Sequence, residues 1–431
     1  MTVTAAVEGI HLLDHPLPSP PLITLLSQHL PHSLPVLRRF QYADNFPDDG
    51  LGVTPYSHCL FASRHAVEEC LTSASGDGGK KKEGRKHFAA AFVDLSRFPE
   101  TQVWVYSTLE DYGVFDPEVG SGSGFGSGFS ALAQSHSLPE DEAKECDQLM
   151  LALLRRMKTI AFNMPVTLED VSEQRQENWR EAREYLLMNP PPSSTDGTTT
   201  TNTNGDTTNG DTTTTNGDNK TARAGPKVMI GSLAEIHRHR LILDKKNGYG
   251  VKMHKTSNIP DEIEWEVCQK WLFRTEALVL PSDALQKIMA EEGLVWDSVR
   301  TKEDVKLVQS RTAIKRQEDT LLGLPSVSIR EKGEKGGGKE GKMVAWGFMA
   351  LDGTLMTLHV EDAYRGKGLA KAVACKVMRD HLSEYGDDGW GAADVFVDNV
   401  RSQGVCKSIG GRVGWLLSWA VVDLGSVGEG L

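Results

Sequence analysis

One segment limits the fold of this chain more than any other. Residues 355–378 read LMTLHVEDAYRGKGLAKAVACKVM, an apolar strand that passes through two glycines directly into a helix. Gly366 and Gly368 would let the backbone approach an anion closely. The free N–H groups of the following helix, at its positive dipole end, would point at that anion. The segment therefore predicts a strand-to-helix turn that holds a phosphate or a similar group.

The length and charge of the chain limit its class. Its 431 residues, 47.2 kDa in all, exceed what one hydrophobic core usually organises, so we expect two domains. A net charge of −12 excludes nucleic acid and an anionic membrane surface as main partners, because both need concentrated Lys and Arg. The basic run at 80–86 lies among Gly, Ser and Asp and indicates a solvated loop. No stretch approaches the ~18 consecutive apolar residues of a membrane-spanning helix, so we expect no membrane.

Cysteine usage and the N-terminus bear on the compartment. The six cysteines show no CxxC spacing, which fits neither a zinc ribbon nor a disulfide framework and favours a reducing environment. The first 18 residues contain Glu8 and Asp14, lack Arg and Lys, and have no long apolar stretch, so no secretory or mitochondrial signal is indicated. We expect a cytoplasmic protein, with the nucleus left open. His237 and His239 do not share a helical face, so we predict no metal site.

Composition divides the chain into four parts. Residues 191–226 are Thr, Asn, Gly and Asp repeats that cannot bury enough apolar surface to fold, which predicts a disordered linker. We expect an N-terminal α/β domain over 1–190, a connecting helical region over 227–290 and a C-terminal domain over 291–431.

Local patterns place the regular elements. In the first part we expect helices at 20–30 and 141–160 and strands at 33–42, 88–95 and 101–108. In the last part we expect strands at 294–299, 326–329, 344–350, 354–360, 393–397 and 415–423, with helices at 302–311, 367–385 and 402–409. The last part is thus an α/β sheet domain with its ligand loop at a strand-to-helix turn.

The pattern at residues 365–370 is significant because of the elements around it. A pattern [Gln/Arg]-x-x-Gly-x-[Gly/Ala] is expected roughly 0.4 times by chance in a chain of this length. Here the match at 365–370 occurs once, follows an alternating apolar strand and opens a helix without proline. With the strand VFVD and the stretch Asn399-x-x-Ser402 that follow, it resembles the coenzyme-A-binding core of the GNAT N-acyltransferase superfamily. The run VAWGF at 344–348, followed by Asp352-Gly353, resembles the glycine N-acyltransferase-like branch.

The resemblance implies a fold, a co-substrate and a set of contacts. The fold would be α+β, a mixed and mostly antiparallel sheet with a splayed strand pair at the coenzyme A site, and residues 291–431 would be the catalytic domain. The N-terminal α/β domain over 1–190 would stand beside it, with a degenerate acyltransferase-like fold as the alternative for that domain. The co-substrate would be acetyl-CoA or another acyl-CoA, without a metal, and the acceptor a small-molecule or peptide amine. The implied acyl-CoA-binding residues are Leu358, Val360, Arg365, Gly366, Lys367, Gly368, Leu369, Ala370, Asn399 and Ser402.

Two departures from the family pattern concern proton transfer. Many members carry a glutamate at the position of Thr354 as general base, and a threonine cannot take that proton at neutral pH. Many carry a tyrosine, which protonates the leaving thiolate, where this chain has Cys406. A thiol with an ordinary pKa of about 8.5 could serve as that acid. The base would then be His359, Glu361 or Asp362, or water where positioning alone suffices.

These considerations lead to one expected function and its alternatives. We expect direct attack of a primary amine on acyl-CoA, with Cys406 and His359 as catalytic residues. His359 would lie on the strand face opposite Leu358 and Val360, where a packed or surface histidine is the competing interpretation. A catalytically impaired acyl-CoA-binding module is the alternative function. A Walker-type nucleotide site is excluded because Lys367 is followed by Gly rather than Ser or Thr. The sequence leaves the acceptor, the acyl-chain length and the oligomeric state open.

Overall fold

The computed structural model describes residues 2–7, 9–47, 51–74, 86–114, 135–186, 226–243, 249–256, 267–279, 282–314, 316–333 and 341–428. The predicted linker at 191–226 lies outside these residues, except for Pro226.

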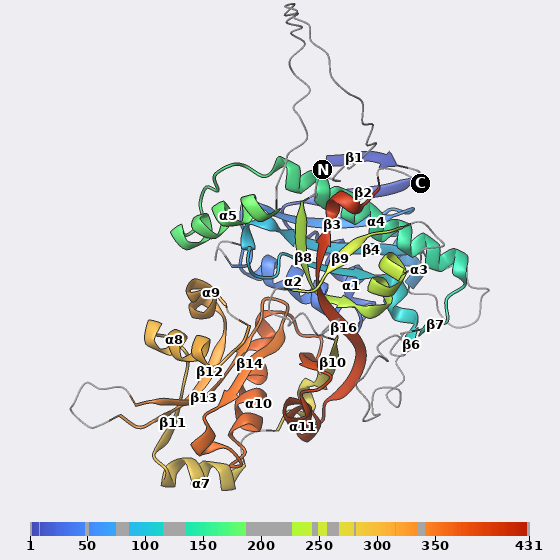
Figure 1. The fold of residues 1–431 in the computed structure, drawn as a ribbon. Helices are drawn as coiled ribbons and strands as arrows, with labels where there is room; N and C mark the ends of the chain where they lie inside the picture. Colours follow the sequence, from blue (N-terminus) through green and yellow to red (C-terminus); the bar gives the residue numbers. More distant parts are fainter. Residues whose placement is uncertain are drawn as a thin grey trace, which may run out of the picture.

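One mixed sheet runs through the molecule (Figure 1). Its fourteen strands are β1 (Thr2–Val7), β2 (Ile10–His15), β3 (Ser57–Ser63), β4 (Phe88–Asp94), β5 (Val103–Ser107), β8 (Lys227–Ala234), β9 (Lys252–His254), β10 (Val267–Arg274), β11 (Leu294–Asp297), β12 (Ser326–Glu331), β13 (Met343–Met349), β14 (Thr354–Val360), β15 (Trp390–Phe396) and β16 (Arg412–Asp423). A separate small sheet joins β6 (Gly113–Val114) and β7 (Ser135–His136).

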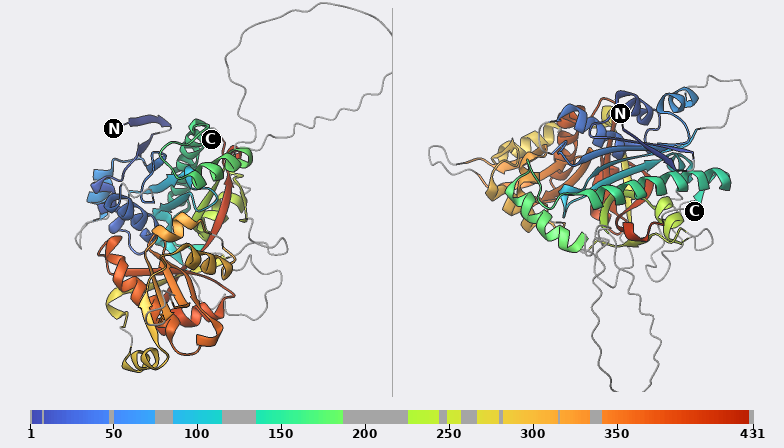
Figure 2. Two further views of the ribbon diagram at one scale, coloured as in Figure 1. Left: turned by 90° about the vertical axis from the view of Figure 1, so that its left-hand side faces the viewer. Right: turned by 90° about the horizontal axis from the view of Figure 1, so that it is seen from above.

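Eleven α-helices pack around the sheet in the described part of the chain. They are α1 (Pro20–Ser27), α2 (Leu34–Asn45), α3 (Val67–Ala74), α4 (Glu140–Asn163), α5 (Glu173–Leu186), α6 (Glu235–Arg238), α7 (Asp283–Glu291), α8 (Lys302–Ser310), α9 (Glu318–Gly323), α10 (Leu369–His381) and α11 (Val400–Ser408). Figure 2 shows the same arrangement from the side and from above.

The strand order repeats itself in mirror fashion about the centre of the sheet. It reads β1-β2-β3-β4-β5-β8-β16-β10-β15-β14-β13-β12-β11, and β9 adds to β16. The two parallel pairs, β5 with β8 and β14 with β15, stand at equivalent places, while the other strand pairs are antiparallel. The fold is therefore α+β and built from two similar halves. We call residues 10–243 the N-half and residues 294–408 the C-half.

Two strands are exchanged between the halves. β10 follows the N-half in sequence, yet it pairs with β15 of the C-half. β16 follows the C-half, yet its second part pairs with β8 of the N-half. The two exchanged strands also pair with each other. Figure 1 shows β16 in red rising from the C-half into the N-half, so that the halves share one continuous sheet.

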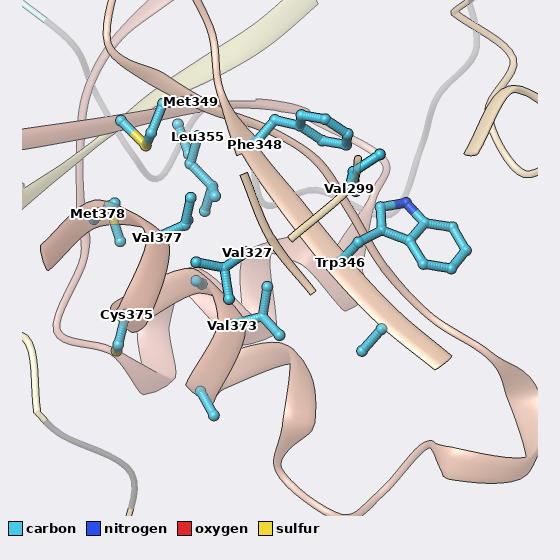
Figure 3. Packing of buried hydrophobic residues seen from close by; sticks show 14 of the residues in the cluster. Val299, Val327, Trp346, Phe348, Met349, Leu355, Val373, Cys375, Val377 and Met378 are labelled. Atoms are coloured by element: carbon cyan, nitrogen blue, oxygen red, sulfur yellow. The ribbon is translucent and has the colours of Figure 1, made fainter. Parts of the chain in front are cut away.

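Helices pack against the sheet in both halves. In β4, Ala89, Ala91 and Val93 join the core beneath α4, while the alternate side chains join the core beneath α1 to α3. In the C-half, Val373 and Val377 of α10 pack on one sheet face, with Val327, Met349 and Leu355 (Figure 3). Trp346 and Phe348 of β13 project on the other side (Figure 3). Both halves thus have the helix-covered sheet that the fold prediction requires.

Two of the predicted elements are wrong. Residues 33–42 form most of helix α2, not a strand. Pro35 in the first turn suits a helix start, and burial of nearly every side chain hides the helical period. Residues 227–290 are not a helical connection, because they supply β8, β9 and the exchanged strand β10 as well as α6 and α7. The regular elements predicted from residue 294 onward are present.

Candidate acyl-CoA and acceptor sites

A bulge and a splay shape the strand before the glycine turn. Gly347 of β13 stands opposite both Thr357 and Leu358 of β14, because the register shifts between Trp346–His359 and Phe348–Met356. Thr357 has φ of +53°, which is rare for a β-branched residue. On its other edge β14 pairs with β15 only at Thr354 and Leu355. Beyond these residues the two parallel strands diverge, which confirms the splayed pair.

The turn after β14 presents a run of free backbone donors. Gly366 and Gly368 have φ of +79° and +84°, and Gly368 caps α10. The N–H groups from Gly366 to Lys371 donate no backbone hydrogen bond within the described residues. The first turn of α10 contains no acidic side chain. An anion here would meet several unpaired donors and the positive end of a helix.

A groove of about 600 Å³ runs past this turn to α11. Of the ten predicted acyl-CoA-binding residues, all but Lys367 line it. Lys367 instead makes an ion pair with Glu292, at 2.5 Å. The groove also has two cations that the motif did not point to, Lys371 and Arg401.

Three of the predicted polar residues make contacts within the protein. Arg365 donates from Nε to the Val360 carbonyl at 3.1 Å and pairs with Asp362 at 2.7 Å. Asn399 caps α11, and its Oδ1 accepts from the Ser402 N–H at 3.1 Å. The Asn399 amide N–H₂ remains available to a ligand in the groove.

The two predicted catalytic residues lie in different places. The His359 ring stacks on Trp346 with centroids 4.6 Å apart, and it lines the groove. Burial lowers the pKa of His359, which favours the neutral ring. Cys406 is buried in α11 and lines a second cavity. Burial raises the pKa of Cys406 to about 12, which makes it a weak acid. Neither role is tested by these positions, and both stay predictions.

This second cavity, of about 280 Å³, adjoins the groove. Groove and cavity share Leu358, Asn399, Ser402 and Val405, so they meet where β14 and β15 separate. The remaining cavity walls come from both halves. The N-half contributes Arg97, Glu100, Thr101 and Trp104, and the α8–α9 connection contributes Thr312, Ile314 and Arg316. A small molecule in this cavity would meet the end of a chain lying in the groove.

A buried ion pair on the cavity wall was not anticipated. Asp394 of β15 lines the cavity, and its Oδ1 lies 2.6 Å from Nζ of Lys270, which is fully buried on β10. A signal existed in the sequence, because each charge interrupts an apolar strand and such residues are seldom buried without a partner. The sequence alone could not pair them, since β10 reaches β15 only through the strand exchange.

Two further searches of the described residues gave no site. No helix there is long and apolar enough to cross a membrane. Among the same residues no group of three or more His, Cys, Asp or Glu side chains is arranged to hold a metal ion.

Comparison with known proteins identifies two family models that match the chain. Residues 7–260 match a family model described as the acyl-CoA N-acyltransferase verG N-terminal domain. Residues 335–420, which include the glycine turn, match an FR47-like protein model. No curated protein matches the chain.

Solved structures give weaker similarities. A Drosophila protein is 17% identical with a TM-score of 0.35, and the match covers 46% of this chain and 61% of that protein. A GCN5-related N-acetyltransferase from Sphaerobacter thermophilus is 11% identical with a TM-score of 0.35, over 99% and 98% of the two chains. A tandem GNAT protein from the clavulanic acid biosynthesis pathway is 10% identical with a TM-score of 0.34, over 96% and 98%.

The assignment therefore rests on the family models, of which the first alone spans more than half of the sequence. The chain belongs to the acyl-CoA N-acyltransferase family of the verG N-terminal domain.

Proposed function

We propose that this protein transfers an acyl group from acyl-CoA to the primary amine of a small molecule. The observation that carries the proposal is that the groove and the cavity are continuous. A groove with unpaired N–H donors at one end opens, between the splayed strands, into a cavity enclosed by both halves. This is the geometry needed to hold a long anionic donor by its phosphates and to present its reactive end to a second substrate.

Each part of the groove suits a part of acyl-CoA. The donors from Gly366 to Lys371 would bind the pyrophosphate, with Lys371 and Arg401 as nearby cations. The Asn399 amide would bind the pantetheine arm, whose amides match its hydrogen-bonding capacity. Bound there, acyl-CoA supplies an activated thioester. Neither Thr357 nor Leu358 has a one-to-one partner on β13 or on β15. The bulge would therefore offer a backbone N–H to the thioester oxygen.

The cavity favours a small acceptor. Its volume of about 280 Å³ is at the lower end of the range for small-molecule sites. It is also covered by the N-half, which restricts access for a folded protein. The resemblance of residues 344–348 to the glycine N-acyltransferase-like branch makes amino acids the first acceptors to try.

An acyl-CoA-binding module without turnover is the second candidate. Thr354 offers no base and the buried Cys406 thiol is a weak acid, which are the observations that favour it. Such a module would use the same groove and release no thiol.

Two measurements separate these functions. Thermal unfolding with acetyl-CoA, longer acyl-CoAs and ATP should show stabilisation by the CoA compounds alone. At 100 times Kd the ligand adds about 2.7 kcal/mol. Absence of any shift with acyl-CoA would contradict both functions. Thiol release with glycine, other amino acids, polyamines and short peptides then tests for transfer, and mass spectrometry identifies the amide. All six cysteines are buried, which keeps the protein's own thiol signal low.

A further inference from the structure

The cavity contains three carboxylates, and only one of them has an oxygen to spare. Glu100 accepts from the Gln317 N–H at 3.0 Å through Oε1 and from the Thr320 hydroxyl at 2.9 Å through Oε2. Asp352 accepts from the Trp104 indole at 3.1 Å and from the Thr354 N–H at 3.2 Å. Glu100 and Asp352 thus use both of their oxygens to accept hydrogen bonds from other residues of the protein around the cavity.

Asp394 differs in its surroundings. Its Oδ1 forms an ion pair with Lys270 Nζ at 2.6 Å, but neither Oδ1 nor Oδ2 has a hydrogen-bond partner of good geometry among the described residues. The side chain is only 6% exposed, so it is shielded from bulk water. A buried polar atom without a partner is costly and needs an explanation. An amine bound in the cavity would supply the missing donor.

The place of Asp394 in the sheet suits contact with the reacting atoms. Thr354 pairs with Ala392 in the parallel register, so Asp394, two residues on, lies on the same sheet face as Thr354. This face is opposite α10, against which Leu355 packs. Asp394 is also the first residue of β15 beyond the last paired position, Ala393. It therefore stands where the strands begin to open.

We propose that Asp394 is the general base that takes a proton from the acceptor amine, held and oriented by Lys270. This inference rests on the proposed acyltransferase function. The unpartnered hydroxyl of Thr354 lies in the same cavity but cannot serve as a base at neutral pH. A carboxylate on the neighbouring strand and the same face takes over that task.

The surroundings of Asp394 give its carboxyl a pKa suited to a general base near neutral pH. Burial raises the pKa of Asp394 to about 6, Lys270 on β10 lowers it, and Asp352 from the β13–β14 turn raises it. Glu100 and Arg97 of the N-half line the same cavity and form a pair at 3.5 Å. At pH 7 a carboxyl of this pKa is about nine-tenths ionised, and it is a far stronger base than an ordinary aspartate.

The step balances without another reactant. The amine nitrogen forms a bond to the thioester carbon while Asp394 Oδ2 accepts one proton from that nitrogen. The C–S bond then breaks, and the sulfur leaves with its electron pair. The thiolate takes up one proton from water, and Asp394 gives the proton that it accepted back to water. The products are the amide and free CoA, and Asp394 is ionised again.

The test uses the full chain, an amine found by thiol release, and three variants. Asp394→Asn should lower kcat/KM for the amine at least 100-fold at pH 7.5, which is typical of a lost general base, and leave the Kd for acetyl-CoA unchanged. It should also abolish the acidic limb near pH 6 in the rate profile. Asp394→Asn with Thr354→Glu should recover part of the rate, because the new carboxylate lies on the same face. Asp380→Asn, an exposed change at the far end of α10, is the control and should behave as wild type.

Lys270→Met tests the role of Asp394 independently if the Asp394→Asn variant does not fold. Loss of the ammonium removes a charge that lowers the pKa of Asp394, so the acidic limb should move to higher pH. A purely structural pair would leave the limb in place.

The outcomes distinguish the two proposals. Wild-type protein that does not bind acetyl-CoA contradicts the proposed function itself. Binding and turnover with an Asp394→Asn variant of normal rate and normal pH profile overturn the role of Asp394 alone. If no amine of the panel reacts, slow hydrolysis of acetyl-CoA gives the same readout, because water would lose its proton to the same carboxylate. Bound acetyl-CoA that is neither aminolysed nor hydrolysed also overturns the inference.

Discussion

The β14–α10 turn of the C-half and the β5–α4 connection of the N-half stand at equivalent places in the sheet, yet they differ in the features that matter to an anion. α10 begins at a left-handed glycine and has no acidic residue in its first turn. α4 begins after Pro139 and has Glu140, Asp141 and Glu142 there. These negative side chains already interact with the positive end of the helix dipole, where a phosphate would otherwise bind.

The strands before these helices differ as well. β14 bulges at Thr357 and Leu358, whereas β5 pairs with β4 in an unbroken register from Val103 to Ser107. In the N-half a buried contact at 3.1 Å joins Glu110, just after β5, to His237, just after β8. This contact lies near the place in the N-half where the C-half has the opening that forms the cavity. The comparison teaches that two halves with the same strand arrangement can differ at the helix start. Among the described residues, the C-half has the run of unpaired donors, and the N-half provides cavity walls such as Trp104.

The largest expected effect concerns the glycine turn. Gly368→Glu should weaken acetyl-CoA binding at least 100-fold, about 2.7 kcal/mol, because it places a negative side chain among the donors and strains a backbone at φ of +84°. Isothermal titration calorimetry measures this. The matched change in the N-half, Asp141→Asn, should leave affinity as it was. Normal affinity in Gly368→Glu would mean that acyl-CoA does not bind at this turn.

The next effect concerns the buried Glu110–His237 contact of the N-half. Glu110→Ala should lower the free energy of unfolding by about 2–4 kcal/mol, because it leaves buried His237 and the Ser107 N–H without their acceptor. Urea denaturation followed by fluorescence measures the loss. Glu177→Ala, which breaks an exposed pair with Arg180, should change little. If Glu110→Ala created a second acetyl-CoA site, the halves would be more alike than we infer.

A smaller effect is expected at the two residues predicted to be catalytic. Cys406→Ala and His359→Gln should each lower kcat by about tenfold or less. The Cys406 thiol is too weak an acid to dominate, and His359 lines the groove rather than the cavity. Steady-state thiol release gives kcat for both. A hundredfold loss in either variant, with normal acetyl-CoA affinity, would restore that residue to a central role.

The smallest effect tests the bulge. Thr357→Gly should change the free energy of unfolding by no more than about 1 kcal/mol, since glycine relieves the strain at φ of +53° but loses more chain entropy. Val105→Gly in the regular strand β5 should cost at least about 2 kcal/mol, because it only removes a buried side chain. Equal losses in both variants would indicate that β14 is regular in solution.

The groove was predictable from sequence and the cavity was not. Gly366, Gly368 and the helix after them are consecutive, so a local pattern specifies the donor-rich turn. The cavity joins Trp104, Arg316 and Asp394, which are far apart in sequence and meet only through the shared sheet. Asp394 was visible as a charge within an apolar strand, but its partner Lys270 belongs to an exchanged strand. The helix α2 was missed because a run buried on all sides shows no period.

The exchange of β10 and β16 also sets the order in which the protein can be completed during synthesis. When β8 has left the ribosome, most of its outer edge has no neighbour, because its antiparallel partner is the last strand of the described chain. A truncated product that stops before Arg412 would expose this edge and the free edge of β10 together, and unpaired edges are where chains aggregate. A fragment that starts at residue 291 would lack β10 and expose the edge of β15. A cut at the boundary that composition suggests would therefore separate the C-half from a strand of its own sheet.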